Sequence, residues 1–192
     1  MLTVLLGYLA GSVPFAFLLA RRAGIDVRFA GSGNVGAANV FRTAGAGRAI
    51  IVMILDIGKG ALAVAFAFLM TASVPLTAAT GAAAVVGHVY PVWLRFRGGK
   101  GVAVAAGVFA VLAPLATLTA VSVFLLFVSV TRYVSLGSVA ATIALPPAAW
   151  LTGAPIAVVV TTVGVAALIV FRHRTNIRRL RAGTERRMGM PA

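Results

Sequence analysis

The first segment that could carry chemistry is a glycine-rich stretch suited to binding phosphate. It reads G-S-G-N-V-G-A-A-N-V-F-R over residues 31–42. Three glycines (Gly31, Gly33 and Gly36) permit backbone conformations with positive φ and let amide N–H groups approach a ligand. Such N–H groups, with the Ser32 hydroxyl and the Asn34 and Asn39 amides, suit phosphate oxygens. Arg42 can add a planar, bidentate contact. A flexible linker is the alternative, but it needs neither paired asparagines nor apolar residues.

A second glycine-rich segment contains a lysine and leads directly into a predicted helix. It is Gly98-Gly99-Lys100-Gly101, followed by an apolar stretch from Val102. A flexible backbone, an ammonium group and a helix N-terminus together favour a phosphate ligand. The segment departs from a nucleotide-binding P-loop, because Leu94 replaces its first glycine and Gly101 replaces the Ser or Thr that binds Mg²⁺.

Two charges interrupt an otherwise apolar segment. Asp56 and Lys59 lie three residues apart in D-I-G-K-G, so on a helix they share one face and can pair. Each charge in a membrane costs at least about 2.5–3.5 kcal/mol on insertion scales. Either the two form a structural ion pair, or Lys59 lines a polar cavity that opens to the cytoplasm. His88, with apolar neighbours, is expected to be a packed, hydrogen-bonded histidine.

The last candidate residues follow the final apolar segment. His173 and Asn176 are three residues apart and share one face of a predicted helix. Histidine titrates near neutrality, which makes His173 a candidate for moving a proton. The basic residues nearby could instead bind anionic lipid; they are Arg179, Arg181, Arg186 and Arg187. Upstream, Ser135, Gly137 and Ser138 are expected to cap or pack a helix.

The composition places all of these residues in a membrane protein. Of 192 residues 61% are apolar and only 10% are charged, and there is no cysteine. A soluble domain has about 45–50% apolar and about 25% charged residues. The absence of cysteine also excludes disulfides, zinc–thiolate sites, iron–sulfur clusters and thiol nucleophiles. The net charge of +14 could suggest nucleic acid, but long uncharged stretches favour a membrane protein instead.

The positions of the basic residues predict the topology. Apolar segments of sufficient length cover approximately residues 2–20, 50–70, 74–94, 133–151 and 155–171. Residues 102–131 form one uncharged stretch with Pro114 near its middle. Basic residues gather in the cytoplasmic loops of membrane proteins. If residues 102–131 cross twice, as two short helices of about 14 residues each, every basic residue except Lys59 lies on one side.

We therefore predict an all-α integral membrane protein of about seven transmembrane helices. Its N-terminus is outside, its C-terminus is cytoplasmic, and residues 1–192 form a single membrane domain with a short basic tail from about residue 172. Gly7 and Gly11 suit close packing of the first helix. The candidate residues then share the cytoplasmic face, and their cations and amides suit an anionic, phosphorylated ligand.

Four segments together resemble the acyl-phosphate:glycerol-3-phosphate acyltransferase family, the PlsY family. They are residues 31–42, D-I-G-K-G (56–60), G-H-V-Y-P-V-W-L-R-F-R-G-G-K-G-V-A (87–103) and N-I-R-R-L-R-A-G-T-E (176–185). They stand in family order and span nearly the whole chain. Ala38 stands where the family usually has Thr, and Trp93 where it usually has an aliphatic residue or Phe.

The resemblance implies an enzyme of the bacterial plasma membrane that moves a fatty acyl group from acyl phosphate to the 1-hydroxyl of glycerol 3-phosphate. It implies catalytic roles for Ser32, Arg42, Lys100, His173 and Asn176. It implies substrate-binding roles for Gly31, Gly33, Asn34, Gly36, Asn39, Lys59, Gly98, Gly99 and Glu185. Because acyl phosphate is already activated, neither a cysteine nucleophile nor a metal is required.

The expected partners are acyl phosphate, glycerol 3-phosphate and membrane lipid. No nucleic acid, metal or cofactor is expected, and the protein can work as a monomer. An anion or organophosphate transporter is the alternative, but such folds contain an inverted repeat that the sequence lacks. A structural lipid-binding protein would not explain the Asn and Gly motifs. Acyltransferases that use His-x-x-x-x-Asp are excluded, since Trp93 follows His88 and Arg178 follows His173 at that spacing.

Overall fold

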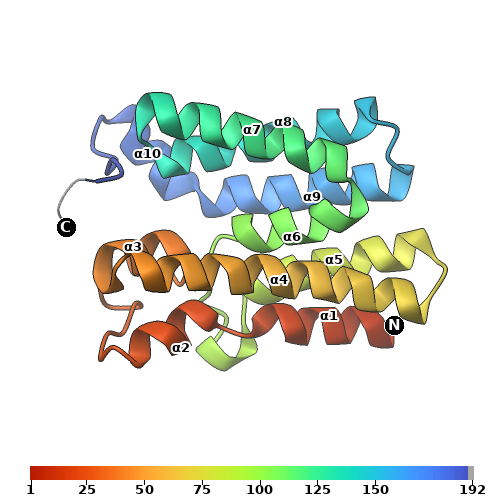
Figure 1. The fold of residues 1–192 in the computed structure, drawn as a ribbon, viewed down its shortest axis with the longest axis horizontal. Coiled ribbons are helices and arrows are strands. Elements are labelled where there is room, and N and C mark those ends of the chain that lie inside the picture. The colour runs from red at the N-terminus through yellow and green to blue at the C-terminus, as the bar shows by residue number, and fades with distance from the viewer. Residues whose placement is uncertain (190–192) are drawn as a thin grey trace. The chain divides into compact units, whose positions relative to one another are not determined.

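The computed structural model describes residues 1–189 and contains only helices and connecting loops within them. The all-α prediction is therefore confirmed for this range. The chain forms two compact units, one of residues 1–108 and one that begins at Phe109. Figure 1 shows the helices of each unit running alongside one another.

The first unit is built around three long helical segments. Helices α1 (Leu2–Ser12), α4 (Ala46–Met70) and α5 (Val74–Val89) pack against each other. Two short helices, α2 (Phe15–Arg21) and α3 (Ala37–Ala44), pack against α4 at the end away from the N-terminus (Figure 1). A 3₁₀ turn, η1 (Val92–Leu94), and the first residues of α6 (Val102–Leu112) complete the unit.

The first predicted span, residues 2–20, is divided into the helices α1 and α2. Val13 has an extended conformation (φ −60°, ψ 117°) between α1 and α2. Pro14 causes the break, since proline has no N–H group and disfavours helical geometry in the residue before it. The Val13 carbonyl is consequently outside the regular helical bonding pattern. It accepts a turn bond from the Phe15 N–H at 3.2 Å.

The third predicted span also ends earlier than expected. Helix α5 stops at Val89, and the chain passes through Pro91 into η1 instead of remaining helical to Leu94. Arg95 and Phe96 then adopt left-handed backbone conformations with φ of 52° and 60°, which are uncommon for residues other than glycine. The turn returns the chain toward α5, where the Gly98 N–H donates to the Val89 carbonyl at 3.1 Å.

Small residues bring helices of the first unit into close contact. A side chain at Gly11 would collide with the Ala84 carbonyl of α5, and one at Gly87 with the Tyr8 carbonyl of α1. This confirms the predicted role of the Gly7/Gly11 pair in packing. In the same way, a side chain at Gly60 of α4 would meet the Val104 carbonyl of α6. Only glycine lets these backbones approach so closely.

The second unit contains the longest uninterrupted apolar helices after α4. They are α7 (Pro114–Thr131), α8 (Val134–Leu151) and α9 (Ile156–Arg172), with α8 packed between the other two. The basic helix α10 (Arg174–Arg181) bends from α9 by 57°. The uncharged stretch 102–131 is divided at Ala113, as predicted from Pro114, but into unequal helices of 11 and 18 residues.

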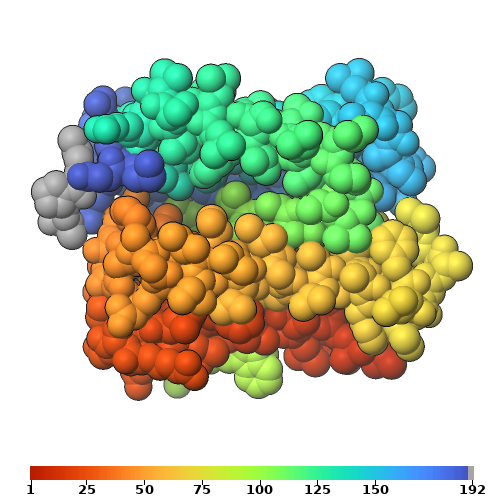
Figure 2. Space-filling view, in the orientation of Figure 1, coloured from red at the N-terminus to blue at the C-terminus, as the bar shows by residue number. Residues whose placement is uncertain are grey.

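By length and composition, four helical segments of the described residues could cross a membrane. They are Leu2–Arg21, Ala46–Met70, Pro114–Thr131 and Val134–Leu151, and the bent pair of α9 and α10 adds a fifth if it is one span. Helix α4 lies on the face shown in Figure 2. It carries large apolar side chains at the surface, among them Ile54 and Leu62, which are 59% and 70% exposed. Such a surface suits lipid. The count of seven spans remains a prediction.

Candidate active site

Asn39 organises the glycine-rich loop that precedes α3. The residue is 1% exposed, and its side-chain amide donates to the carbonyls of Val27 and Ala30, each at 3.0 Å. Its Oδ1 atom accepts the Ser32 N–H at 2.9 Å. Both donors and one acceptor position of this amide are therefore used to hold the loop backbone. Asn39 fixes the loop around Ser32 in one conformation.

The glycines of this loop have the conformations that their identity predicts. Gly31 and Gly33 have φ of 62° and 70°, in the left-handed region. A side chain at Gly31 would also collide with Asn39 Oδ1. Gly36 ends the loop and caps α3, whose last turn carries Arg42. Ser32 is exposed and Asn34 and Arg42 are half-buried, so the predicted phosphate-binding groups lie at or near the surface of one loop and its following helix.

An acidic residue outside the predicted motifs also shapes this loop. Arg28 forms a bidentate ion pair with Asp26, with N–O distances of 2.9 and 2.6 Å, and lies over the Phe17 ring at 4.7 Å. The hydrogen bond from Arg28 is the main reason that the pKa of Asp26 falls to about 2. Asp26 therefore stays ionised at neutral pH and neutralises one loop arginine. The i, i+2 spacing of the pair was the signal available in the sequence.

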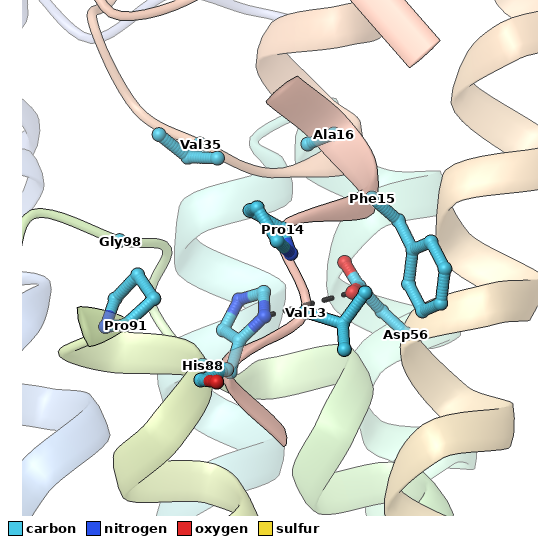
Figure 3. A pocket seen from close by; sticks show the side chains of 10 residues that line it. Val13, Pro14, Phe15, Ala16, Val35, Asp56, His88, Pro91 and Gly98 are labelled. Atoms are coloured by element: carbon cyan, nitrogen blue, oxygen red, sulfur yellow. Dashed lines mark ion pairs between the residues drawn. The ribbon is translucent and has the colours of Figure 1, made fainter. Parts of the chain in front are cut away.

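A buried polar network links the break in the first span to helices α4 and α5. Lys59 Nζ lies 2.8 Å from Asp56 Oδ1, 2.8 Å from the Val13 carbonyl and 3.0 Å from His88 Nδ1. Asp56, Lys59 and His88 are each less than 10% exposed. Figure 3 shows Asp56 and His88 directed toward one another beside Val13 and Pro14. The predicted Asp56–Lys59 pair is confirmed, and so is the hydrogen-bonded state of His88.

The glycine–lysine loop packs against this network. The Gly98 and Gly99 N–H groups donate to the carbonyls of Val89 and His88, each at 3.1 Å. A side chain at Gly99 would collide with the Nε2 atom of His88 and would lie 2.7 Å from the Val35 carbonyl of the other loop. The two predicted phosphate loops thus adjoin at Val35 and Gly99. Lys100 follows directly and is half-buried, two residues before α6 begins.

In the second unit, Glu185 accepts hydrogen bonds from three polar side chains in and beside α10. Its carboxylate accepts Ser135 Oγ at 2.7 Å, Asn176 Nδ2 at 2.6 Å and Arg179 Nε at 2.6 Å. Burial would raise the pKa of Glu185, but these three hydrogen bonds outweigh it and hold the pKa below the ordinary value of 4.5. Ser135 was expected only to cap or pack its helix. Its bond to Glu185 was not predicted, because the two lie 50 residues apart.

His173 occupies the bend between α9 and α10 and is 2% exposed. Its Nδ1 atom lies 2.8 Å from the Ile169 carbonyl. A carbonyl can only accept, so Nδ1 carries the proton in the neutral ring and Nε2 is the basic nitrogen. His173 therefore has the tautomer required of a residue that takes up a proton at Nε2.

The predicted site residues fall into one set in each unit. The first unit contains Ser32, Asn34, Asn39, Arg42, Lys59 and Lys100, together with the loop glycines, and brings the two glycine loops into contact. The second contains His173, Asn176 and Glu185. Among residues 1–189, no group of three or more His, Cys, Asp or Glu side chains is arranged to hold a metal ion.

The chain is similar over nearly its whole length to known enzymes. The sequence pattern of the glycerol-3-phosphate acyltransferase family matches residues 1–183. The glycerol-3-phosphate acyltransferase of Geotalea daltonii is 48% identical over 93% of this chain and 92% of its own. That of Rubrobacter xylanophilus is 46% identical over 98% of this chain and 94% of its own.

Solved structures give the same answer for the fold. The crystal structure of PlsY, an integral membrane glycerol 3-phosphate acyltransferase, in its glycerol 3-phosphate form has a TM-score of 0.94 and 40% identity, covering 98% of this chain and 94% of that one. The lysophosphatidic acid form of PlsY has a TM-score of 0.92 at the same identity and coverage.

The fold and these likenesses define an integral membrane acyltransferase, with several spans in the bacterial inner membrane. The chain belongs to the glycerol-3-phosphate acyltransferase family. The resemblance drawn from its four motifs is thereby confirmed, and the comparisons give no support to a transporter.

Proposed function

We propose that this protein transfers a fatty acyl group from acyl phosphate to the 1-hydroxyl of glycerol 3-phosphate. The products are lysophosphatidic acid and inorganic phosphate. The observation that carries the proposal is the likeness, over 98% of the chain, to PlsY in its glycerol 3-phosphate form. The chemistry of the predicted site agrees with it, since both substrates carry phosphate, and Lys100 in one loop and Arg42 in the helix after the other supply cations.

The groups proposed to hold the substrate phosphates lie in the first unit. Ser32, Asn34, Arg42 and Lys100 supply a hydroxyl, an amide and two cations, and Gly31, Gly33, Gly36, Gly98 and Gly99 supply close backbone approach. Asn39, Lys59 and Glu185 were also predicted to bind substrate. Because their polar atoms are engaged by the protein itself, we assign them the task of positioning neighbouring groups.

The proposed reaction uses the substrate phosphate as its base. The 1-hydroxyl oxygen attacks the acyl carbon, a C–O bond to the acceptor forms, and the C–O bond to phosphate breaks. The hydroxyl proton goes to a phosphate oxygen, whose second pKa near 6 suits a base at neutral pH. His173 and Asn176 orient the acceptor, with His173 Nε2 able to assist the proton. Catalysis then comes mainly from positioning and charge stabilisation.

The proposal includes the predicted topology and partners. Seven spans with an external N-terminus place both glycine loops and α10 at the cytoplasmic face, where the water-soluble acceptor is available. The chain then works as a single membrane domain, as a monomer, without metal, cofactor or nucleic acid. The acyl donor reaches the site from the surrounding lipid.

The experiment is an assay of the purified protein in detergent with acyl phosphate and glycerol 3-phosphate. Lysophosphatidic acid and inorganic phosphate should appear in equal amounts, and glycerol in place of glycerol 3-phosphate should give no acylated product. Because detergent leaves no sealed compartment, transport cannot produce the signal. Absence of product with folded protein would contradict the proposal.

A further inference from the structure

We propose that Asp56, Lys59 and His88 position the Gly98–Lys100 loop, so that His88 is a positioning residue for the reaction without touching substrate. The inference rests on the proposed function, because it takes Lys100 to be a phosphate-binding group. The observations that carry it are the contacts of the buried network and the way that the loop packs against His88.

The Lys59 ammonium group makes its three close polar contacts with groups of the protein itself. An ammonium group has three donors and no acceptor. Its three close partners are Asp56 Oδ1, the Val13 carbonyl and His88 Nδ1, at 2.8, 2.8 and 3.0 Å. Two of these contacts are hydrogen bonds, to the Val13 carbonyl and to His88 Nδ1, and the third is an ion pair with Asp56. His88 Nδ1 also lies 3.6 Å from Asp56 Oδ1, the ion pair drawn as a dashed line in Figure 3.

The opposite side of the His88 ring meets the loop. Nε2 is the atom with which a side chain at Gly99 would collide. The backbone of the same residue is also bonded to the loop, since the Gly99 N–H donates to the His88 carbonyl at 3.1 Å. The imidazole therefore lies between Lys59 on one side and the backbone that precedes Lys100 on the other.

The network is too tightly packed to be a substrate pocket. The cavity beside it is lined by Ser12, Val13, Pro14, Phe15, Ala16, Val35, Asp56, His88, Pro91 and Gly98. Its volume of ≈ 10 Å³ leaves space for about one water molecule, and Figure 3 shows Pro14, His88 and Pro91 crowded around it. An effect of these residues on catalysis must therefore pass through the elements that they hold.

Four parts of the chain converge on this network. They are the break between α1 and α2, one turn of α4, the end of α5, and the loop before α6. A displacement of about 1 Å in a positioning element can lower the reaction rate by about a hundredfold. Removing the His88 ring while leaving the helices intact should thus disturb Lys100 more than it disturbs the fold.

The test is a double-mutant cycle of His88→Ala and Lys100→Ala in the purified full-length protein. The measurements are kcat/KM for each substrate and the thermal unfolding midpoint in detergent. Lys100→Ala should lower kcat/KM at least about tenfold, and His88→Ala alone should do so as well. In the Lys100→Ala background, His88→Ala should change kcat/KM by less than about twofold, because the loop no longer carries the group that it positions.

The matched control removes another buried polar side chain from the same helix. Thr80→Ala deletes a hydroxyl that is bonded only within α5, to the Leu76 carbonyl, and should leave the kinetics unchanged. If His88→Ala does not yield folded protein, His88→Gln replaces it in the cycle. Gly99→Ala is the independent variant: its methyl group meets Nε2, so kcat/KM should fall at least about tenfold in a folded protein.

The outcomes separate the two proposals. Wild-type kinetics in Lys100→Ala would contradict the phosphate site itself and the inference with it. If Lys100→Ala lowers kcat/KM but His88→Ala lowers it by the same factor with or without Lys100, the inference is overturned and the phosphate site is not. Wild-type kinetics in both His88 and Gly99 variants would overturn it as well.

Discussion

At the scale of single residues, the structure separates groups that bonds within the protein occupy from groups proposed to meet substrate. Asn39, Lys59 and Glu185 have their polar atoms engaged by the chain. The sequence predicted them to bind substrate, because buried polar residues and ligand-binding residues are of the same types. Which of the two applies depends on contacts between distant positions, such as Ser135 with Glu185, that no local pattern contains.

Lys100 and Arg42 provide the clearest residue-level prediction. If they served only as cytoplasmic charges, Lys100→Arg and Arg42→Lys would have no effect. Because arginine is a planar fork and lysine a compact point charge, a phosphate contact should not tolerate the exchange. Each variant should remain folded but lose roughly 1.5–3 kcal/mol of transition-state stabilisation, about tenfold or more in kcat/KM. Near-normal turnover in both would remove them from the site.

Glu185 predicts a dependence on pH. Its pKa is lower in the folded protein than the ordinary 4.5, so ionised Glu185 stabilises the fold above that value. This contribution is lost as the pH falls through the folded pKa. The thermal midpoint of the wild type in detergent should therefore decrease between pH 6 and pH 3 by more than that of Glu185→Gln. Equal pH dependence in the two proteins would contradict the prediction.

Glu185→Gln should also reduce activity at neutral pH. Glutamine cannot form the ion pair with Arg179, and loss of a charged hydrogen bond costs about 1.5–3 kcal/mol. The expected result is a less stable α10 and lower kcat. Ser135→Ala, which removes one neutral donor from the same carboxylate, is the milder comparison and should have the smaller effect.

At the scale of the elements, the presence of the long helices was predictable from the sequence, but the residues at which they break or end were not. Long apolar runs identified every long helix, and Pro114 located the division of residues 102–131. Pro14 was present in the first apolar run, yet a proline near the middle of a span can also be accommodated in a kinked helix. The structure shows a break instead, with Val13 extended and its carbonyl bonded to Lys59. The turn at Arg95 and Phe96 has no glycine to mark it.

The close approach of α1 and α5 predicts that size is critical at Gly11. Gly11→Leu places atoms where the Ala84 carbonyl lies, so the helices must separate. We expect a loss of about 1–3 kcal/mol in stability, as for overpacked cores. Gly164→Ala is the control, since a side chain there meets nothing within 4 Å. The thermal midpoint in detergent should fall for the first variant only.

At the scale of the whole molecule, the charge distribution predicts the topology. Reporter fusions that are active only outside the membrane should be active after residue 72 or 153 and inactive after residue 98 or 180. Within residues 1–189, four to five helical segments meet the length criterion for a span, so α5 and α6 decide the count. Activity of the fusion at residue 180 would remove one short helix from the predicted seven.

The whole chain also predicts independence from metal. It has only three acidic residues, and Asp26, Asp56 and Glu185 are each paired with a basic side chain. Mg²⁺ needs several carboxylate and water oxygens in an octahedral arrangement. Acyl transfer should therefore continue in the presence of EDTA. Complete loss of activity that added Mg²⁺ restores would contradict the metal-free mechanism.

The break at Val13 and Pro14 has a consequence for biogenesis. Synthesis proceeds from the N-terminus, so the first apolar segment leaves the ribosome before Lys59 has been made. The Val13 carbonyl then has no Lys59 ammonium as a partner, and it gains one only when α4 arrives beside it. In a nascent chain that ends shortly before Lys59, the first segment should therefore be less stably inserted in the membrane than in one that extends through Met70. The second segment would complete the insertion of the first.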